Sequence, residues 1–234
     1  MAEGPGGGYA RGPSALSLPQ SIDDRPRRVR LPGVRPPKPL LPPEIEERLT
    51  ERQRQLLDEL EELIIGGDLA DVTMAQIAAR VNCSLRTLYG ISPSKDELVL
   101  TVMDRRLHRI GREAVESLDP ALPPLDALRV YLTTAHEAVD SERGEMIRNF
   151  LDVPGAKRLF DSHENYLTAV VRGLLDRAVG EGHLARVDTA AVAHVLGGLG
   201  QVFSRAHVSP SLEASPKQTA NDLTEIILRG LEER

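Results

Sequence analysis

A set of polar residues between positions 86 and 95 could bind an anionic partner. Arg86 can pair with a phosphate or, through two hydrogen bonds, with the edge of a guanine. The hydroxyl groups of Thr87 and Tyr89 suit phosphate oxygens, and Gly90 lets the backbone approach a ligand closely. Lys95 stands at an expected helix start, where the helix dipole disfavours a cation unless an anion lies opposite. These residue types indicate contact with the phosphates and base edges of DNA.

Two short helices must position these residues. Thr73 and Gln76 have the spacing of a capping box, so a helix is expected to begin there. Its apolar stripe, at positions i, i+3, i+4 and i+7, consists of Met74, Ile77, Ala78 and Val81. Asn82 can take a left-handed conformation and end this helix, and Ser84 is a good N-cap for the next one. The pattern predicts a helix-turn-helix over about residues 73–92.

The second helix should turn Leu88 and Ile91 inward, beneath its polar face. Ser94 and Glu97 have capping-box spacing and open a third helix at Lys95. The residues expected to face DNA are Thr73, Ser84, Leu85, Arg86, Thr87, Tyr89, Gly90 and Lys95. The alternative is that residues 73–91 form two ordinary core helices, since helix pairs with a three-residue turn are common.

The segment from about Arg54 to Leu100 resembles the N-terminal domain of the tetracycline repressor (TetR) family. The matching stretches are RQLLDELEELIIGG, DVTMAQIAARV, SLRTLY and PSKDEL. The resemblance implies an all-α fold, with an N-terminal three-helix DNA-binding domain and a C-terminal helical domain for ligand binding and dimerisation. It also implies a homodimer whose two recognition helices enter successive major grooves of a palindromic operator.

The chain departs from the family pattern at a few positions. Asn82 stands where the family usually has Gly, and Ser92 stands where it usually has a Phe that anchors the recognition helix in the core. The first helix usually carries small residues where Glu59 and Leu60 stand. The space left by the Phe is expected to be filled by Ile91 or by a leucine of the first helix. Because no DNA-facing group is lost, these changes bear on stability and helix angle more than on function.

Composition sets further bounds on the protein. The chain has 234 residues, of which 41% are hydrophobic and only 3% aromatic, so Leu, Val, Ile and Ala are expected to fill the core. Its single cysteine, Cys83, leaves no pair for an internal disulfide, fits a reducing cytoplasm, and is expected to pack as a small hydrophobe. No apolar run reaches the roughly 18 residues of a membrane helix, and no signal peptide is evident.

The net charge of −6 means that DNA binding must depend on local basic groups. The acidic side chains expected to face away from DNA are Glu46, Glu47, Glu59, Glu61 and Glu62. Residues 1–43 are rich in Gly and Pro and lack any helical or strand period, so a disordered arm is expected. This arm could reach a minor groove or phosphates through Arg25, Arg27, Arg28 and Arg30. Alternatively, it is a leader that serves solubility, or the product of an upstream start codon chosen in error.

Apolar periodicity and capping residues predict about nine helices and no strand, so the chain is expected to be all-α. The expected spans are about 44–65, 73–81, 85–91, 95–118, 125–140, 142–151, 156–179, 188–207 and 215–231. Residues 44–94 are expected to form the DNA-binding domain, and residues 95–234 the effector-binding and dimerisation domain.

Three glycines lie inside the expected helix at 188–207, and each costs about 1 kcal/mol relative to Ala. Close helix packing would offset this cost. The resemblance implies that the last two helices form a dimer interface. Its expected residues are Gly197, Gly198, Gly200, Phe203, Leu223, Ile226 and Ile227. The alternative is that the glycines serve packing within one subunit.

The resemblance also implies a cavity for a small-molecule effector among the helices between residues 95 and 179. Its candidate lining residues are Met103, Leu107, Tyr131, His136, Met146, Phe150 and Tyr166. The alternative is that these residues are plain core. The histidines do not share a helix face at metal-ligand spacing, so no metal site is expected. No Ser/His/Asp set or phosphate loop is present in the sequence, so no catalytic residue, no cofactor and no enzymatic activity are expected.

We interpret the sequence as a homodimeric, cytoplasmic transcriptional regulator, a repressor that responds to a ligand. Its expected partners are a double-stranded DNA operator and an unknown small-molecule effector. Effector binding would shift the helix that begins at Lys95 and move the DNA-binding heads apart. The alternative function is a helical dimer whose head binds a protein, although a protein interface would gain more from apolar residues than from Arg86, Thr87 and Tyr89.

Overall fold

The computed structural model describes Met1 and residues 31–66, 72–137, 150, 152–205 and 207–232. These residues form nine α-helices and one 3-10 helix, with no strand among them, which confirms the predicted all-α class. The helices are α1 (Pro43–Arg48), α2 (Glu51–Ile65), α3 (Met74–Arg80), α4 (Leu85–Ile91), α5 (Lys95–Glu116), α6 (Pro124–Glu137), α8 (Ala156–Gly180), α9 (Thr189–Phe203) and α10 (Pro216–Leu231), with the 3-10 helix η2 at Ser209–Ser211. Within the described ranges, no helix combines the length and the apolar character needed to cross a membrane.

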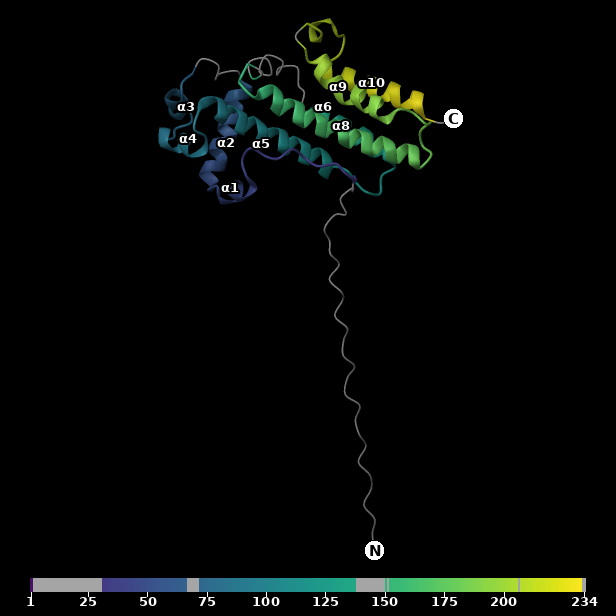
Figure 1. Cartoon of the computed structure of the whole chain (residues 1–234), viewed down its shortest axis with the longest axis horizontal. Coiled ribbons are helices and arrows are strands. Elements are labelled where there is room, and N and C mark those ends of the chain that lie inside the picture. The colour runs from purple at the N-terminus through teal and green to yellow at the C-terminus, as the bar shows by residue number, and fades with distance from the viewer. Residues whose placement is uncertain (2–30, 67–71, 138–149, 151, 206, 233–234) are drawn as a thin grey trace.

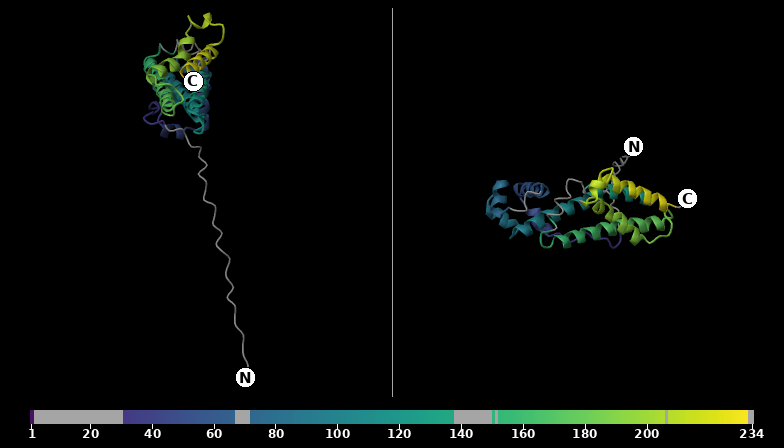
Figure 2. Two further views of the ribbon diagram at one scale, coloured as in Figure 1. Left: turned by 90° about the vertical axis from the view of Figure 1, so that its right-hand side faces the viewer. Right: turned by 90° about the horizontal axis from the view of Figure 1, so that it is seen from above.

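The helices build an elongated molecule with the helix-turn-helix at one end (Figure 1). Helices α1 to α4 gather at that end and form what we call the head. Helix α5 runs from the head into the body, which comprises α6, α8, α9 and α10 (Figures 1 and 2). The end of α10 lies far from α3 and α4 in Figure 1 and in the right-hand view of Figure 2, so the two ends present separate surfaces.

The first expected helix, over residues 44–65, is in fact two helices. Leu49 has an extended backbone, with φ −60° and ψ 132°, and ends α1. The Thr50 side chain accepts a hydrogen bond from Gln53 N–H, and the Thr50 N–H donates back to Gln53 Oε1 at 2.9 Å. This capping box begins α2 as a new helix. Ile45 of α1 is 48% exposed, so it does not extend the buried apolar face of α2.

The head has one apolar core, to which α2, α3, α4 and the start of α5 all contribute. Its buried side chains include Leu56, Leu57, Leu60, Ile64, Met74, Ile77, Ala78, Val81, Leu88, Leu98, Val99 and Val102. The stripe predicted for α3 is buried at all four positions, as expected. Because Leu88 of α4 shares this core, the apolar contacts hold α4 at a fixed angle to α3.

The body has a second core in which α6, α8, α9 and α10 meet. Its buried side chains include Leu128, Tyr131, Leu132, Val170, Val171, Leu174, Leu175, Ala193, Leu196, Ala220 and Leu228. Gly197 allows α9 to approach α8 closely, since a Cβ there would lie only 2.9 Å from Leu167 Cδ2 and 3.2 Å from Thr168 Oγ1. This glycine is used for packing within the subunit.

The last part of the expected disordered arm, residues 31–42, instead packs along the helices. Leu31 lies against Gly173 of α8, where a Cβ would come within 3.2 Å of the leucine side chain. The Leu40 N–H donates to Asp104 Oδ2 of α5 at 2.7 Å. Composition and periodicity missed this segment, because a few anchored leucines in an extended chain produce no regular pattern.

Other expectations differ in extent from the structure. Helix α9 ends at Phe203, with Ser204 as its C-cap, rather than near His207. Several predicted positions lie outside the described residues, namely Arg25, Arg27, Arg28, Arg30, Met146 and nearly all of the helix expected at 142–151.

Candidate nucleic-acid interface

The turn between α3 and α4 has the geometry that a helix-turn-helix needs. Asn82 has φ 47°, the left-handed conformation predicted from its residue type. The Cys83 N–H donates to Ala78 O at 2.9 Å and closes the end of α3. The Thr87 N–H donates to Ser84 Oγ at 3.0 Å and begins α4. Two consecutive caps thus define where α3 stops and α4 starts.

The predicted hydroxyl groups take part in these caps. Thr73 Oγ1 accepts from Gln76 N–H at 3.3 Å, and the reciprocal half of the capping box is also present. Ser84 Oγ lies 2.8 Å from Thr87 Oγ1. A hydroxyl that accepts a backbone N–H keeps its own O–H to donate, so whichever of Ser84 and Thr87 does not donate to the other can still donate to a phosphate oxygen.

Arg86 and Tyr89 project from the exposed face of α4. Both side chains are exposed, Tyr89 by 51%, and neither makes a hydrogen bond or ion pair with any residue that the structure describes. Leu85 is 40% exposed on the same short helix, and a Cβ at Gly90 would meet nothing within 4 Å. Lys95, by contrast, is partly buried at the start of α5. The sequence therefore identified an accessible polar face on α4.

The inner face of α4 is anchored as predicted, with one unusual position. Leu88 is fully buried, and Ile91 is partly buried against the head core. Ser92, where the TetR resemblance would place a Phe, is buried with its Oγ 3.5 Å from Thr101 Oγ1 of α5. A hydroxyl pair and the neighbouring Ile91 thus stand in place of an aromatic anchor.

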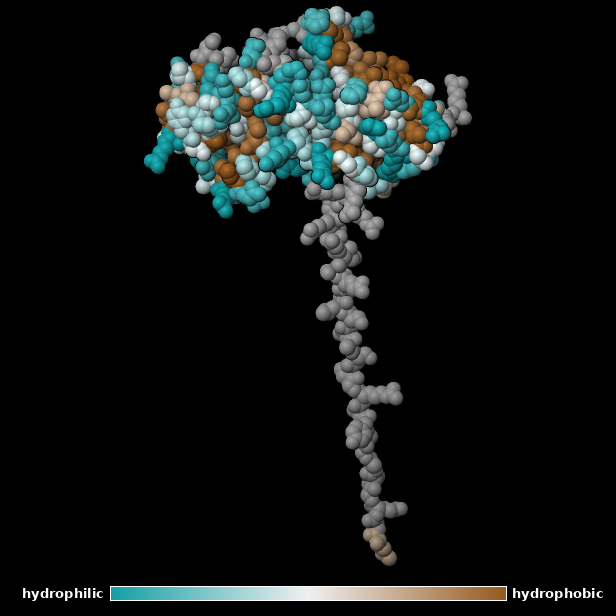
Figure 3. Space-filling view, viewed as in Figure 1, coloured by the Kyte–Doolittle hydropathy of each residue, from teal (hydrophilic) through white to brown (hydrophobic). Residues whose placement is uncertain are grey.

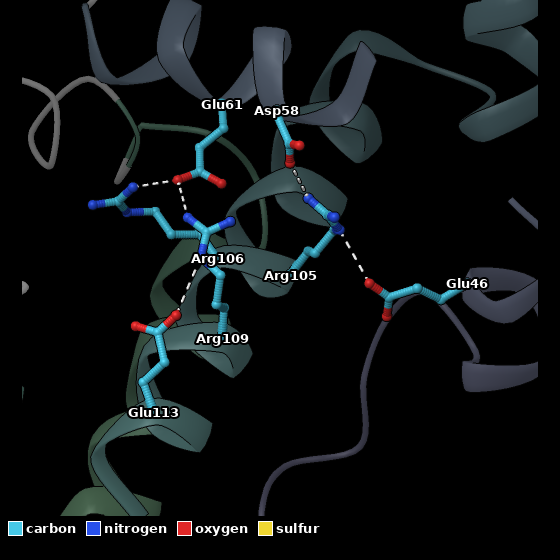
Figure 4. Close-up of polar contacts among 7 residues, drawn as sticks. All are labelled: Glu46, Asp58, Glu61, Arg105, Arg106, Arg109 and Glu113. Carbon is cyan, nitrogen blue, oxygen red and sulfur yellow. Dashed lines mark hydrogen bonds and ion pairs between the residues drawn. The ribbon is translucent and has the colours of Figure 1, made fainter. Parts of the chain in front are cut away.

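A network of ion pairs joins α2 of the head to α5 (Figure 4). Glu61 accepts hydrogen bonds from Arg106 and Arg109, and the distance from Arg109 Nη2 to Glu61 Oε1 is 2.6 Å. The side chains of Glu61 and Arg106 are only 4% and 9% exposed. These two charges neutralise each other inside the junction, where either one alone would be costly.

Arg105 forms the outer half of the same junction. Its Nη1 lies 2.7 Å from Asp58 Oδ1, and its Nε lies 3.1 Å from Glu46 Oε1. Burial alone would lower the pKa of Arg105, but the hydrogen bonds to Asp58 and Glu46 outweigh it and raise the pKa. Several acidic side chains of the head are therefore directed at the arginines of α5.

A surface pocket of about 460 Å³ lies beside this junction. It is lined by Gln55, Asp58, Glu59, Glu61, Glu62 and Arg109. Its mainly acidic wall would repel a polyanion, so this pocket does not extend the polar face of α4.

The predicted effector residues divide between the two cores. Met103 and Phe150 are buried in the head core, and Leu107 packs against it. Tyr131 is buried in the body core, and Tyr166 packs against that core. Core packing therefore accounts for the burial of the described members of this set.

His136 and Tyr131 are the polar members of the effector set that are most deeply buried. His136 Nδ1 lies 2.8 Å from Asn221 Oδ1 of α10, and burial lowers the pKa of His136. Burial also raises the pKa of Tyr131. Both side chains are therefore uncharged at neutral pH.

The predicted dimer residues differ in accessibility. Ile226 is 65% exposed, and a Cβ at Gly198 would meet nothing within 4 Å. Gly200 is buried, and Gly197 faces α8, so packing within the subunit explains these two glycines better than a dimer contact does. Phe203, Leu223 and Ile227 are partly buried against the body core.

Sequence reasoning missed two features. Val195 and Val202, which are 52% and 39% exposed, lie on the outer face of α9 with Gly198. Asp104 and His108 of α5 also meet His163 of α8. The i, i+4 spacing of Asp104 and His108 was visible in the sequence, but their partner on α8 was not.

These elements and their geometry define a helix-turn-helix protein. No family model matches the chain. Two curated proteins from strains of Mycobacterium tuberculosis, both described as uncharacterized HTH-type transcriptional regulators, are 32% identical to it over 80 residues. The match covers 34% of this chain and 40% of each relative, so the chain spans less than half of their length.

Solved structures extend the likeness to the fold. A TetR transcription regulator from Haloarcula marismortui matches with a TM-score of 0.67 at 14% identity, over 79% of this chain and 100% of the other. The TetR family regulator PfmR from Thermus thermophilus matches with a TM-score of 0.55 at 22% identity, over 76% and 100%. The ketosteroid transcriptional regulator KstR2 of Mycobacterium tuberculosis matches with a TM-score of 0.55 at 18% identity, over 80% and 98%.

The chain therefore has the fold of the TetR family of transcriptional regulators. The resemblance found in the sequence is confirmed at this level. The similar proteins are described as transcriptional regulators.

Proposed function

We propose that this protein is a transcriptional regulator that binds a palindromic DNA operator as a homodimer in the cytoplasm. The observation that carries the proposal is the exposed pair Arg86 and Tyr89 on α4, which has no hydrogen-bond or ion-pair partner among the described residues. A capped turn and a buried inner face hold this pair rigidly on a TetR fold. Rigid presentation matters because base contacts need side chains at fixed positions relative to the groove.

The proposed DNA-binding domain comprises residues 44–94, and residues 95–234 provide effector binding and dimerisation. Helix α5 connects the two parts, since Lys95 lies beside the helix-turn-helix and the other end of α5 lies in the body. The ion pairs of Arg105 and Arg106 with α2 join the head to α5. This connection supports repression that an effector relieves. A coupling free energy of about 1–3 kcal/mol between effector binding and DNA binding would change the affinity for DNA about 5- to 150-fold.

Dimerisation is supported by an apolar surface on α9 and α10, which we call the outer face. It contains Val195, Gly198 and Val202 of α9 and Ile226 of α10. Residues 191, 195, 198 and 202 recur at helical spacing on the side of α9 opposite its buried residues. Figure 3 shows hydrophobic surface gathered over this end of the molecule. A second copy of the chain would bury this surface and place two α4 helices on one DNA.

The direct test is selection of bound sequences from random double-stranded DNA by the full-length protein, followed by footprinting on genomic DNA. We expect an inverted repeat whose half-sites are protected on one face of the duplex. Recovery of no enriched sequence at low salt would contradict DNA recognition. Enrichment of a single half-site would contradict only the dimeric arrangement.

A further inference from the structure

Asp104, His108 and His163 come together where α5 and α8 pass between the two cores. Asp104 and His108 are one turn apart on α5, and His163 faces them from α8. His163 Nε2 lies 3.0 Å from Asp104 Oδ1, and His108 Nε2 lies 3.5 Å from the same oxygen. The three potential ligand atoms all lie within 4.8 Å of one another.

The two distances from Asp104 Oδ1 fit the edges of a metal coordination sphere. Zn²⁺ binds imidazole nitrogen and carboxylate oxygen at about 2.0–2.2 Å, so neighbouring ligand atoms in a tetrahedral site are about 3.3 Å apart. The two measured distances from Asp104 Oδ1 lie on either side of this value. Two imidazoles and one carboxylate are also a common donor set for divalent transition metals in sites that keep an open position.

The ring of His108 faces the Asp104 carboxylate at ion-pair distance. Its Nε2 is buried and has no hydrogen-bond partner in the part of the chain that the structure describes, although buried polar atoms ordinarily have one. The ring meets that of His163 edge to face, with centroids 4.7 Å apart.

The carboxylate is held in place from its other side. Asp104 is 1% exposed, and its Oδ2 accepts the Leu40 N–H at 2.7 Å. Metal ligands are commonly oriented by such outer hydrogen bonds. The bond to Leu40 leaves Oδ1 directed at the two histidines.

We propose that Asp104, His108 and His163 form a site for one divalent transition-metal ion, with Zn²⁺ as its representative. The three side chains supply three ligands, and the fourth position is open to water. The ion joins α5 to α8 and, through the bond between Asp104 and Leu40, to the segment 31–42. The site requires no DNA and therefore stands independently of the proposed function.

The test is calorimetric titration of Zn²⁺ into full-length protein that carries no histidine tag and has been stripped with a chelator. We expect one ion per chain and a higher thermal midpoint in its presence. His108→Gln and His163→Gln should each weaken binding at least about 100-fold, since even the loss of an outer partner costs about 10–100-fold. His183→Gln, at a histidine that is 47% exposed, is the matched control and should bind as the parent does.

Titration with Co²⁺ gives a second measurement that does not depend on whether the variants fold. The parent protein should show two paramagnetically shifted imidazole N–H resonances, one from each histidine. Absence of saturable Zn²⁺ binding would overturn the proposal. Unchanged affinity in the folded variants, or a Co²⁺ spectrum with fewer than two histidine signals, would overturn it as well.

Discussion

The outer face of α9 and α10 and the exposed face of α4 are both accessible, but they differ in chemistry. The outer face exposes Val195, Val202 and Ile226, whereas α4 exposes Arg86 and Tyr89. Water solvates the guanidinium and phenol groups of α4 well, so their exposure costs little. It solvates valine and isoleucine poorly, and burying them is favourable by about 25 cal/mol per Å². The first surface fits an apolar, permanent partner and the second an anionic, exchangeable one.

This difference predicts that the two surfaces respond differently to salt. Binding through α4 should weaken steeply as salt rises, because protein cations replace counterions on DNA. Association through the outer face should change little, because hydrophobic burial does not depend on screened charges.

The largest effect is expected from a charge placed on the outer face. Ile226→Glu would bury an unpaired carboxylate in each half of the dimer, and an uncompensated buried charge costs about 3–5 kcal/mol. The dimer dissociation constant should rise at least about 100-fold, as measured by sedimentation equilibrium. Ile226→Leu is the conservative control and should remain dimeric. A dimer that tolerates the glutamate would place the interface elsewhere.

A smaller effect is expected at the ionic junction between the two surfaces. Glu61→Gln removes the negative charge from a buried site and leaves Arg106 without a counter-charge. The free energy of unfolding should fall by about 3 kcal/mol in urea denaturation, with the dimer retained by the folded protein. Glu62→Gln, at the exposed neighbouring position, is the control. Equal stability of the two variants would show that the junction contributes little.

The smallest effect is expected at the turn that sets the angle of α4. Asn82 has φ 47°, a conformation that costs an ordinary residue roughly 1–2 kcal/mol and glycine nothing. Asn82→Ala should therefore lower the free energy of unfolding by about 1 kcal/mol, while Asn82→Gly should stay within about 0.5 kcal/mol of the parent. Thermal unfolding followed by circular dichroism checks both values. An alanine variant as stable as the parent would contradict the left-handed turn.

The parts of the fold that the sequence predicted are local. The buried stripe of α3, the caps at Thr73 and Ser84, and the left-handed Asn82 each follow from residues within one or two turns. The exposure of Arg86 followed from the same periodicity. Such features depend on backbone geometry and on neighbours three or four residues apart, which a single sequence displays directly.

The parts that escaped prediction depend on partners distant in the chain. Arg106 pairs with Glu61 across 45 residues, and His163 meets Asp104 across 59. Nothing in the spacing of these residues indicates that α2, α5 and α8 bring them together. The break between α1 and α2 was missed for another reason. The capping box at Thr50 starts a new helix, but the spacing of apolar residues on either side of it is that of a single helix.

The exposed face of α4 is proposed to bind DNA in a sequence-specific way. Fluorescence anisotropy with the selected operator tests this binding most directly. The parent, Arg86→Ala and Arg172→Ala would be titrated over a range of salt concentrations. Arg172 is exposed on α8, away from the proposed interface, and serves as the matched control for lost positive charge. Arg86→Ala should weaken binding about 5- to 150-fold, corresponding to about 1–3 kcal/mol, while Arg172→Ala should bind as the parent does. Equal affinity of the parent and Arg86→Ala at every salt concentration would contradict the claim.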